Sequence, residues 1–295
     1  MRLKEHYGIT VPTSSARVIT QRHAHEMHKQ EEKQQNMIDD NRNGQPIVLA
    51  ETDGSMIPMV KAKPKPEGAE VYDARKHKDH FWKEGRLSLA HAIGSVTPVF
   101  AGTLGGVEEV GSQLYHCVKT VGCNDNTKIH CIGDGAVWIA NQVEEQFGTQ
   151  ATYLVDFYHV CEYLAQAAPK CSGTGHKEWM ENQKENLKVG RLNDVLEALV
   201  PYQEPDVVKD CDAPVRRCYR YLDNRRDQLD YADAIAKGLP IGSGEIESAH
   251  RYIIQERLKI TGAWWKEESA ADMLALRINR ANRNWESYWN SRKAA

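Results

Sequence analysis

The sequence of 295 residues lacks several features that would assign it to a particular class of protein. It contains no apolar run of the roughly 18 residues that a membrane-spanning helix needs. Its start, MRLKEHYGITVPTSS, has no apolar core of the kind that marks a signal peptide. The seven cysteines include no CxxC pair, and the chain has no internal repeat or low-complexity segment. We therefore predict a cytoplasmic protein with reduced thiols and no association with a membrane.

The composition is that of an ordinary globular protein, with 41% apolar and 27% charged residues. A chain of this length can bury a full core. The net charge of −3 gives no general attraction to a polyanion, but the charge is unevenly distributed. Residues 101–165 carry eight acidic and two basic side chains, and residues 251–295 carry nine basic and five acidic ones. This pattern suits a cation site beside a phosphate-binding surface, and it suits solvated helix faces equally well.

An N-terminal helix is predicted for residues 13–40, where serine and threonine can cap the first turn. The tract HAHEMH in this segment brings His23, His25 and His28 close together in sequence. Only His25 and His28 share one face of a helix. We interpret the segment as a surface helix rather than as a metal site.

The first half of the chain alternates predicted strands with predicted helices. PIVLAETDG predicts a strand that ends at Asp53, followed by a turn and a second strand at SMIPMV. After a loop rich in proline and lysine, another strand is predicted around Leu87 to Val99, and SQLYHCVKTVG is compatible with a short helix or strand. TKIHCIGDG predicts a strand that ends at Asp134, and the helix after it has apolar residues about every 3.6 positions. ATYLVDFYHV adds one more strand and helix, so the pattern is α/β.

The second half is predicted to be helical. Residues 159–237 have helical periodicity and no strand signal. The segment that follows begins with a glycine-rich turn, LPIGSGEIE, and continues as two helices joined near TGAWW.

Several carboxylates occupy positions at which the predicted strands and helices do not require an acidic side chain. Asp53 and Asp134 each follow an apolar run and precede a glycine, which lets the chain turn sharply. Glu247 lies at the start of a predicted helix. Carboxylate oxygens suit Mg²⁺ or Mn²⁺ rather than zinc, and two such ions about 4 Å apart can bridge a phosphodiester. A single Asp-Gly after a strand is usually an ordinary turn, so only the combination indicates a site.

Three blocks of this sequence resemble the DDE-type transposases of bacterial insertion sequences, in the groups related to Mutator-like transposases. ETDGSMIPMV resembles the block with the first catalytic aspartate, here Asp53. IGDGAVWIANQVEEQFGTQATYLVDFYHVCEYL resembles the second block, with Asp134 and a D-x-x-H element formed by Asp156 and His159. LPIGSGEIESAHRYIIQERLKITGAWW resembles the block with the catalytic glutamate. The family pattern favours Glu247 over Glu245, and the resemblance covers roughly residues 45–290.

The resemblance implies a DNA transposase that cleaves a DNA strand and transfers its 3′ end, on an RNase H-like catalytic core. Asp53, Asp134 and Glu247 would hold two Mg²⁺ or Mn²⁺ ions, and Asp156 and His159 would position a strand or the scissile phosphate. For His159, a buried histidine that is hydrogen-bonded within the core is the alternative. The partners would be the double-stranded DNA of the transposon ends and of the target, bound by a homo-oligomer at the bacterial nucleoid.

Other functions remain open at this stage. An RNase H-like nuclease would use the same metal chemistry without joining strands, and an inactive protein of transposon origin would only bind DNA. A glycosidase also uses paired carboxylates, but nothing in the sequence resembles a sugar-binding aromatic platform.

The expected fold class is α/β, with a mixed-sheet core interrupted by a helical insertion and completed by a helical C-terminus. Asp134 and Glu247 are 113 residues apart, which is too far for one strand–helix step. We therefore assign the core to residues 45–160 and 239–295, and the insertion to residues 161–238. Residues 1–44 would be a helical remnant of a longer DNA-binding region, and we expect the chain to be a truncated reading frame. The candidates for phosphate contacts are the arginines of the insertion, Arg216, Arg217, Arg220, Arg225 and Arg226.

Overall fold

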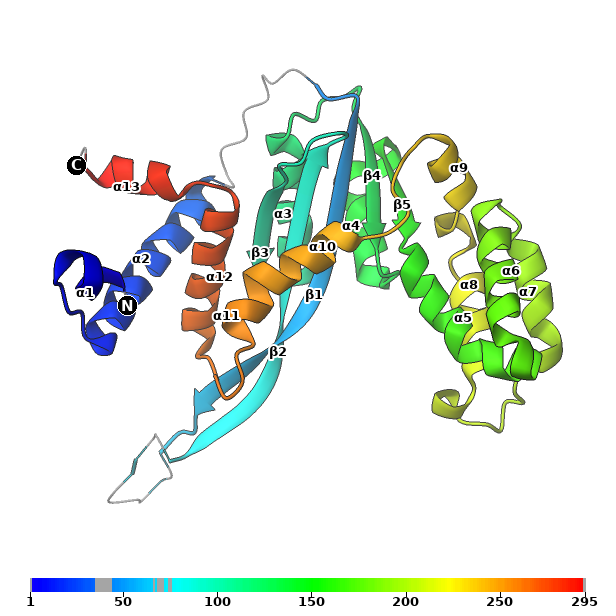
Figure 1. Cartoon of the computed structure of the whole chain (residues 1–295), viewed down its shortest axis with the longest axis horizontal. Helices are drawn as coiled ribbons and strands as arrows, with labels where there is room; N and C mark the ends of the chain where they lie inside the picture. Colours follow the sequence, from blue (N-terminus) through cyan, green and yellow to red (C-terminus); the bar gives the residue numbers. More distant parts are fainter. Residues whose placement is uncertain (1, 35–43, 66, 68–71, 74–75, 294–295) are drawn as a thin grey trace.

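The computed structural model describes residues 2–34, 44–65, 67, 72–73 and 76–293. A five-stranded sheet lies at the centre, with one group of helices on each side of it (Figure 1). The strand order is β3-β2-β1-β4-β5. The strands are β1 (Ile47–Ala62), β2 (Lys78–Ala92), β3 (Val99–Thr103), β4 (Lys128–Gly133) and β5 (Ala151–Val155).

The sheet is mixed, which confirms the expected fold class. The hairpin of β1 and β2 and the next pair, β2 and β3, are antiparallel. On the other side of β1, strands β4 and β5 run parallel to it. Strand β1 is therefore the place where the sheet changes from antiparallel to parallel pairing.

The prediction of a strand end at Asp53 is wrong, because β1 is one strand of 16 residues. Its parallel pairing with β4 ends at Glu51, opposite Ile132. Beyond that point β1 continues in antiparallel pairing with β2, so Asp53 lies opposite Leu87. Strand β2 thus pairs with the backbone of Asp53 and Gly54. In a local Asp-Gly turn, the same backbone groups would be hydrogen-bonded to water.

The strand expected around Leu87 to Val99 is also wrong in its bounds. Two strands, β2 and β3, meet there at a turn in which Gly94 has a φ of +77°. That left-handed conformation is open to glycine at little cost. The SQLYHCVKTVG segment is helical and belongs to α3 (Val107–Thr120).

The two faces of the sheet are covered by different helices. Val48, Ala50 and Ala90 face α3 and α4 (Val137–Phe147) in one core. Ile57 and Met59 belong to a second core with the C-terminal helices and α2. Alternate residues of a strand point to opposite faces, and each fully buried Val, Ile or Met side chain contributes about 1.5–3 kcal/mol.

The helical insertion has a core of its own, which joins the sheet at β5 through Leu154 and Val155. Figure 1 shows it as a separate group of helices beside β5. Its helices are α5 (Phe157–Ser172), α6 (His176–Lys188), α7 (Leu192–Leu199), α8 (Pro214–Asp223) and α9 (Tyr231–Ala236).

The C-terminal part is helical, as expected, but it is divided more finely than into two helices. The first stretch is α10 (Gly244–Ala249), a π-helical turn η6 (His250–Gln255) and α11 (Glu256–Leu258). After the TGAWW segment, α12 (Glu267–Ala281) and α13 (Trp285–Lys293) are separated at Arg283, whose φ is +59°. The TGAWW segment pairs with β1, since Val60 N donates to Trp265 O at 2.7 Å.

The N-terminal region forms α1 (Arg2–Tyr7) and α2 (Thr13–Gln34), and residues 35–40 of the predicted helix lie outside the described residues. As predicted, α2 lies at the surface with most of its side chains exposed, and one face of it packs on the core. Met27 is fully buried in the core shared with α12, and His23 Nδ1 lies 2.7 Å from Tyr288 Oη. His25 and His28 do share a face, and both contact Asp272 of α12.

In the described part of the chain, the helices are too short or too polar to cross a lipid bilayer. The seven cysteines are all free thiols.

Candidate active site

A small pocket lies where β1 turns away from β4. It has a volume of about 190 Å³. Its lining residues are Thr52, Asp53, Gly133, Asp134, Asp156, His159, Ser243 and Glu247. The structure therefore brings together the five residues that the resemblance assigned to the site, Asp53, Asp134, Asp156, His159 and Glu247, from four separate segments. Pockets at the carboxyl ends of parallel strands, beside a change in sheet topology, are common ligand sites in α/β proteins.

A second hollow of about 250 Å³ adjoins the first, and Asp53 and Glu247 line both. Its other lining residues are Gly54, Ser55, His250, Arg251 and Gln255. Glu245, the less favoured glutamate, lines neither hollow. Its carboxylate is half exposed and lies 3.2 Å from His91 Nε2, so Glu247 is the glutamate of this site.

The carboxylates of the pocket act on one another electrostatically. Burial raises the pKa of Asp53 to about 6, partly offset by a hydrogen bond from the Gly54 backbone. The negative charges of Asp134, Glu84 and Glu247 raise this pKa further. Like charges raise a carboxyl pKa in this way when no counter-charge lies nearby. A cation in the pocket would relieve the repulsion.

The spacing of the acids differs from that of a metal-ligand set. Among the residues that the structure describes, no three histidine, cysteine, aspartate or glutamate side chains form an arrangement that could hold a metal ion. Asp53, Asp134 and Glu247 thus share a pocket without converging on one point. Their donor chemistry fits a hard divalent cation, because such ions take carboxylate oxygens.

Asp134 stands in a turn that the helical insertion holds in place. Its Oδ1 accepts a hydrogen bond from Ala136 N at 2.8 Å. Its backbone carbonyl accepts from Tyr221 Oη at 2.7 Å, and the next carbonyl, of Gly135, accepts from Arg225 Nε at 2.9 Å. Gly135 has a φ of +83°, and a Cβ there would lie 2.4 Å from Tyr221 Oη. Helix α8 therefore fixes the backbone on which Asp134 is carried.

Asp156 is fully engaged inside the protein. It caps α5, since its Oδ1 accepts from Tyr158 N at 2.6 Å and from His159 N at 3.0 Å. Its Oδ2 accepts from Ser243 N at 2.6 Å and from Ser243 Oγ. These bonds hold the turn that leads into the Glu247 helix.

The same turn is held at several other points. Phe157 N donates to Ile241 O at 2.9 Å, and His130 Nε2 lies 2.9 Å from Pro240 O. Gly242 packs against the ring of Tyr158, where a Cβ would lie 2.7 Å from a ring carbon. The position of α10 is thus set by contacts to β4 and α5.

Glu51 is a buried acid of this region that the sequence analysis did not single out. Its Oε2 accepts a hydrogen bond from Ile246 N at 2.8 Å, and burial raises its pKa to about 8. The available signal was a glutamate inside the apolar run PIVLAETDG, two residues before Asp53. Residues two apart in a strand face the same side, so Glu51 lies beneath α10 next to Asp53.

His159 is half-buried at the pocket, so the alternative of a hydrogen-bonded core histidine is wrong. Its Nδ1 lies 3.7 Å from Glu162 Oε2, and its ring meets the edges of Tyr163 and Tyr221.

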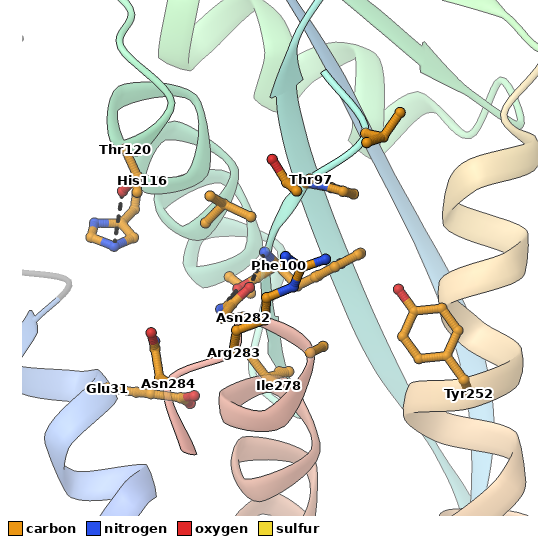
Figure 2. Close-up of a pocket in the computed structure, with 15 residues that line it drawn as sticks. Glu31, Thr97, Phe100, His116, Thr120, Tyr252, Ile278, Asn282, Arg283 and Asn284 are labelled. Carbon is orange, nitrogen blue, oxygen red and sulfur yellow. Dashed lines mark hydrogen bonds between the residues drawn. The ribbon is translucent and has the colours of Figure 1, made fainter. Parts of the chain in front are cut away.

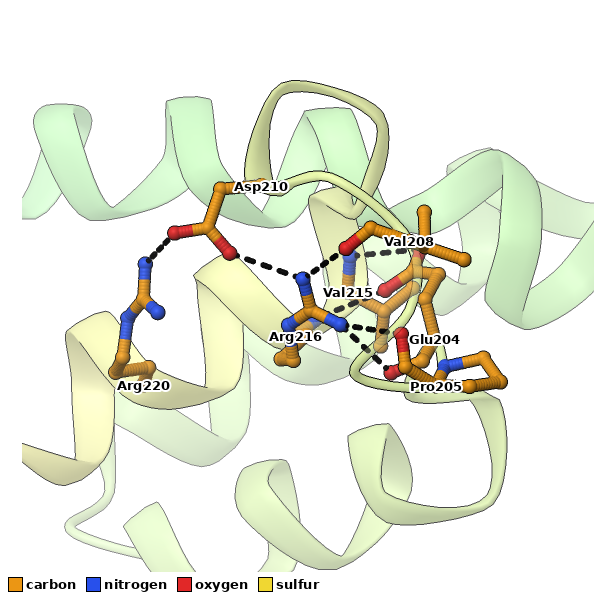
Figure 3. A network of polar contacts seen from close by, with 7 residues as sticks. All are labelled: Glu204, Pro205, Val208, Asp210, Val215, Arg216 and Arg220. Carbon is orange, nitrogen blue, oxygen red and sulfur yellow. Dashed lines mark hydrogen bonds and ion pairs between the residues drawn. The ribbon is translucent and has the colours of Figure 1, made fainter.

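The five arginines of the insertion do not form one surface. Arg216 is largely buried, and its guanidinium donates to the carbonyls of Glu204, Pro205 and Val208 and to Asp210 (Figure 3). Because its donors are used inside the protein, we correct its assignment from phosphate contact to structural residue. Arg220 pairs with the other oxygen of Asp210 at 2.6 Å but is half exposed.

The other three arginines differ in how firmly they are held. Arg217 donates to Gln166, and Arg226 contacts Asp223 and Asn193. Arg225 stacks 4.0 Å from the ring of Tyr221 and donates to Gly135, so among the five it is the one attached to the turn of Asp134.

Comparison with known proteins gives one sequence family. The family described as "Uncharacterised protein family (UPF0236)" matches residues 108–292, which include Asp134, Asp156, His159 and Glu247 but not Asp53. No curated protein matches the chain. Among solved structures, the chain is similar to a chain of the "Drosophila P element transposase strand transfer complex", at 8% identity and a TM-score of 0.31. That alignment covers 98% of this chain and 75% of the other, and a likeness of this level carries no argument about function.

Proposed function

The chain belongs to the uncharacterised protein family UPF0236, and we propose that it is a metal-dependent DNA transposase, which cleaves DNA strands and joins their 3′ ends to a target. One observation carries the proposal. Asp53 on β1, Asp134 after β4 and Glu247 on α10 line one pocket at the edge where the sheet changes from antiparallel to parallel pairing. The mixed sheet, with its helical insertion between the second aspartate and the glutamate, supports an RNase H-like core.

Asp53, Asp134 and Glu247 would hold the Mg²⁺ or Mn²⁺ ions of the reaction. Bound ions of this kind stabilise the charge that develops on a phosphodiester during in-line attack by water or by a 3′-hydroxyl. The carboxylates would be drawn together on binding, because the charge of the cation would offset the mutual repulsion that raises the pKa of Asp53.

Other residues in and around the pocket would support the reaction without touching the ions. His159 lines the pocket on the side of the insertion, where its imidazole can meet a phosphate oxygen. Asp156, Ser243 and Glu51 hold the two ends of the turn into α10 and so set the place of Glu247. Arg217, which is partly buried, and Arg220, which is exposed, are the two arginines of α8 that we assign to the DNA backbone.

The test compares Asp134→Asn with the wild-type chain on labelled duplex DNA taken from the flanks of the reading frame, in Mg²⁺ or Mn²⁺. We expect the variant to fold normally and to lose cleavage by at least about 100-fold, because it lacks a charge that binds the cation. A simple turn residue would behave differently, since asparagine Oδ1 can also accept from Ala136 N. Full cleavage by Asp134→Asn would contradict the proposal.

Two further arms make the test specific. Asp125→Asn is a matched control, because Asp125 stands in an exposed turn before β4, away from the pocket. Transfer of the labelled 3′ end into a plasmid separates a transposase from a nuclease of the same chemistry. Cleavage without transfer would reduce the proposal to an RNase H-like nuclease.

A further inference from the structure

His250 lies beside the proposed site, although no sequence motif pointed to it. It follows Glu247 by three residues, so the two side chains share one face of the helix. The His250 side chain is 4% exposed, and its Nε2 lies 3.3 Å from Asp53 Oδ2. His250 therefore connects the helix of the glutamate to the strand of the first aspartate.

The surroundings of this ring are unusual. In the described part of the chain, neither ring nitrogen of His250 makes a well-formed hydrogen bond. A buried polar group without a partner destabilises the folded state, so such groups are few in native proteins and call for a reason. His250 is also the first residue of the π-helical turn η6, and π-helical turns inside α-helices frequently occur at functional sites.

We propose that His250 is a positioning residue for Asp53. Its Nε2–H would hold Asp53 Oδ2 and leave the other carboxylate oxygen for the pocket shared with Asp134 and Glu247. The inference rests on the proposed function, since it requires Asp53 to be a cation ligand. Carboxylates that bind metals are usually held by such outer partners, and losing one typically weakens metal affinity by 10–100-fold.

A packing role for the ring is the competing explanation, and two substitutions separate the roles. His250→Leu fills most of the space without a donor. His250→Gln places an amide N–H close to where Nε2 stands. A packing residue tolerates the apolar side chain at least as well as the amide, whereas a positioning residue is rescued only by the amide.

His91 offers a matched control. Its side chain is 5% exposed, and its Nε2 lies 3.2 Å from a carboxylate of the same helix, that of Glu245. Glu245 does not line the pocket, so His91→Leu repeats the loss of a buried histidine without affecting Asp53.

The experiment measures Mn²⁺ affinity of the full chain by calorimetry or by the resonance of free Mn²⁺, together with the melting temperature. We expect His250→Leu to raise the Kd by 10–100-fold, and His250→Gln and His91→Leu to stay within about threefold of the wild type. Equal Kd values for His250→Leu and the wild type would overturn the inference, as would equal weakening by Leu and Gln.

Failure of the proposed function and misfolding of a variant would give results that differ from those above. A wild-type chain that binds no Mn²⁺, or one whose binding survives Asp134→Asn, would overturn the proposed function and the inference with it. If His250→Leu does not fold, His250→Asn replaces it, because its shorter amide reaches the position of Nδ1 rather than that of Nε2. The inference then requires weakened binding by the Asn variant and near-normal binding by the Gln variant.

Discussion

Asp156 and Ser243 are 87 residues apart in sequence, yet one carboxylate oxygen of Asp156 accepts both the N–H and the hydroxyl of Ser243. The other oxygen caps α5. One buried side chain thus joins the start of the helical insertion to the turn that leads into the Glu247 helix.

The first prediction concerns this link. Asp156→Asn turns an acceptor into a donor against N–H groups, so we expect a loss of about 2–3 kcal/mol in the free energy of unfolding. Cleavage should fall less than in Asp134→Asn, because Asp156 acts through the position of Glu247. Urea unfolding and the cleavage assay measure the two effects. Asp230→Asn is the control, since Asp230 caps α9 but touches no part of the site; an equal loss of cleavage there would contradict the positioning role.

The second prediction compares alanine substitutions at two glycines of the same turn. A Cβ at Gly242 would lie 2.7 Å from the ring of Tyr158, whereas a Cβ at Gly244 would meet nothing within 4 Å. We expect Gly242→Ala to lower both stability and cleavage, because the ring or the turn must move. Gly244→Ala should be neutral or slightly stabilising, since alanine favours a helix start more than glycine does. Thermal melting and cleavage rates check both variants, and equal behaviour of the pair would show that the turn adjusts freely.

The arginines of α8 separate into structural and surface groups. Arg216→Ala should destabilise the chain by about 2–4 kcal/mol, since it leaves carbonyls of the 204–210 loop without their donor. Arg217→Ala combined with Arg220→Ala should leave stability nearly unchanged and weaken DNA binding with little sequence preference. Each phosphate contact removed should make the salt dependence shallower by about one unit of slope. Unchanged slopes would mean that these two side chains do not reach DNA.

A pH effect is expected from Glu31, which lines a cavity of about 650 Å³ between α2, β3 and the α12–α13 turn (Figure 2). Burial raises the pKa of Glu31 to about 8, from an ordinary value of 4.5. The folded state therefore binds this proton more tightly than the unfolded state, and stability falls as pH rises from about 4.5 to about 8. Above that range the folded state has lost the whole contribution.

Glu31→Gln should remove this part of the pH dependence and make the chain more stable than the wild type at pH 8. Unfolding in urea between pH 5 and 9 measures the difference. Glu268→Gln is the control, because Glu268 is exposed on α12. A parallel pH dependence in wild type and Glu31→Gln would show that water in the cavity solvates the carboxylate.

Much of the fold could be predicted from the sequence because it follows from residue patterns within short segments of the chain. The alternation of apolar strand and periodic helix from Lys128 to Ser172 needed only local rules, and it placed Asp134 at its turn. The glycine-rich segment before α10 likewise marked the start of the helix that carries Glu247. That five of the pocket's residues belong to one site followed instead from the resemblance of three sequence blocks to a known family, because local patterns do not tell which distant residues meet.

Tertiary structure decided the rest, for reasons that lie outside any short window of sequence. Asp53-Gly54 has the local chemistry of a turn, but a full row of partners on β2 keeps β1 extended through it. Arg216 has the composition of a DNA contact, and only the fold of the 204–210 loop around it shows that its donors are already used. Glu51 and His250 became visible through burial, since an acid or a histidine is ordinary in sequence and costly only where packing removes its water. The sequence by itself determined the strands and helices from Lys128 to Ser172 and the turn that carries Asp134, and the packing of distant segments determined which acids share a pocket.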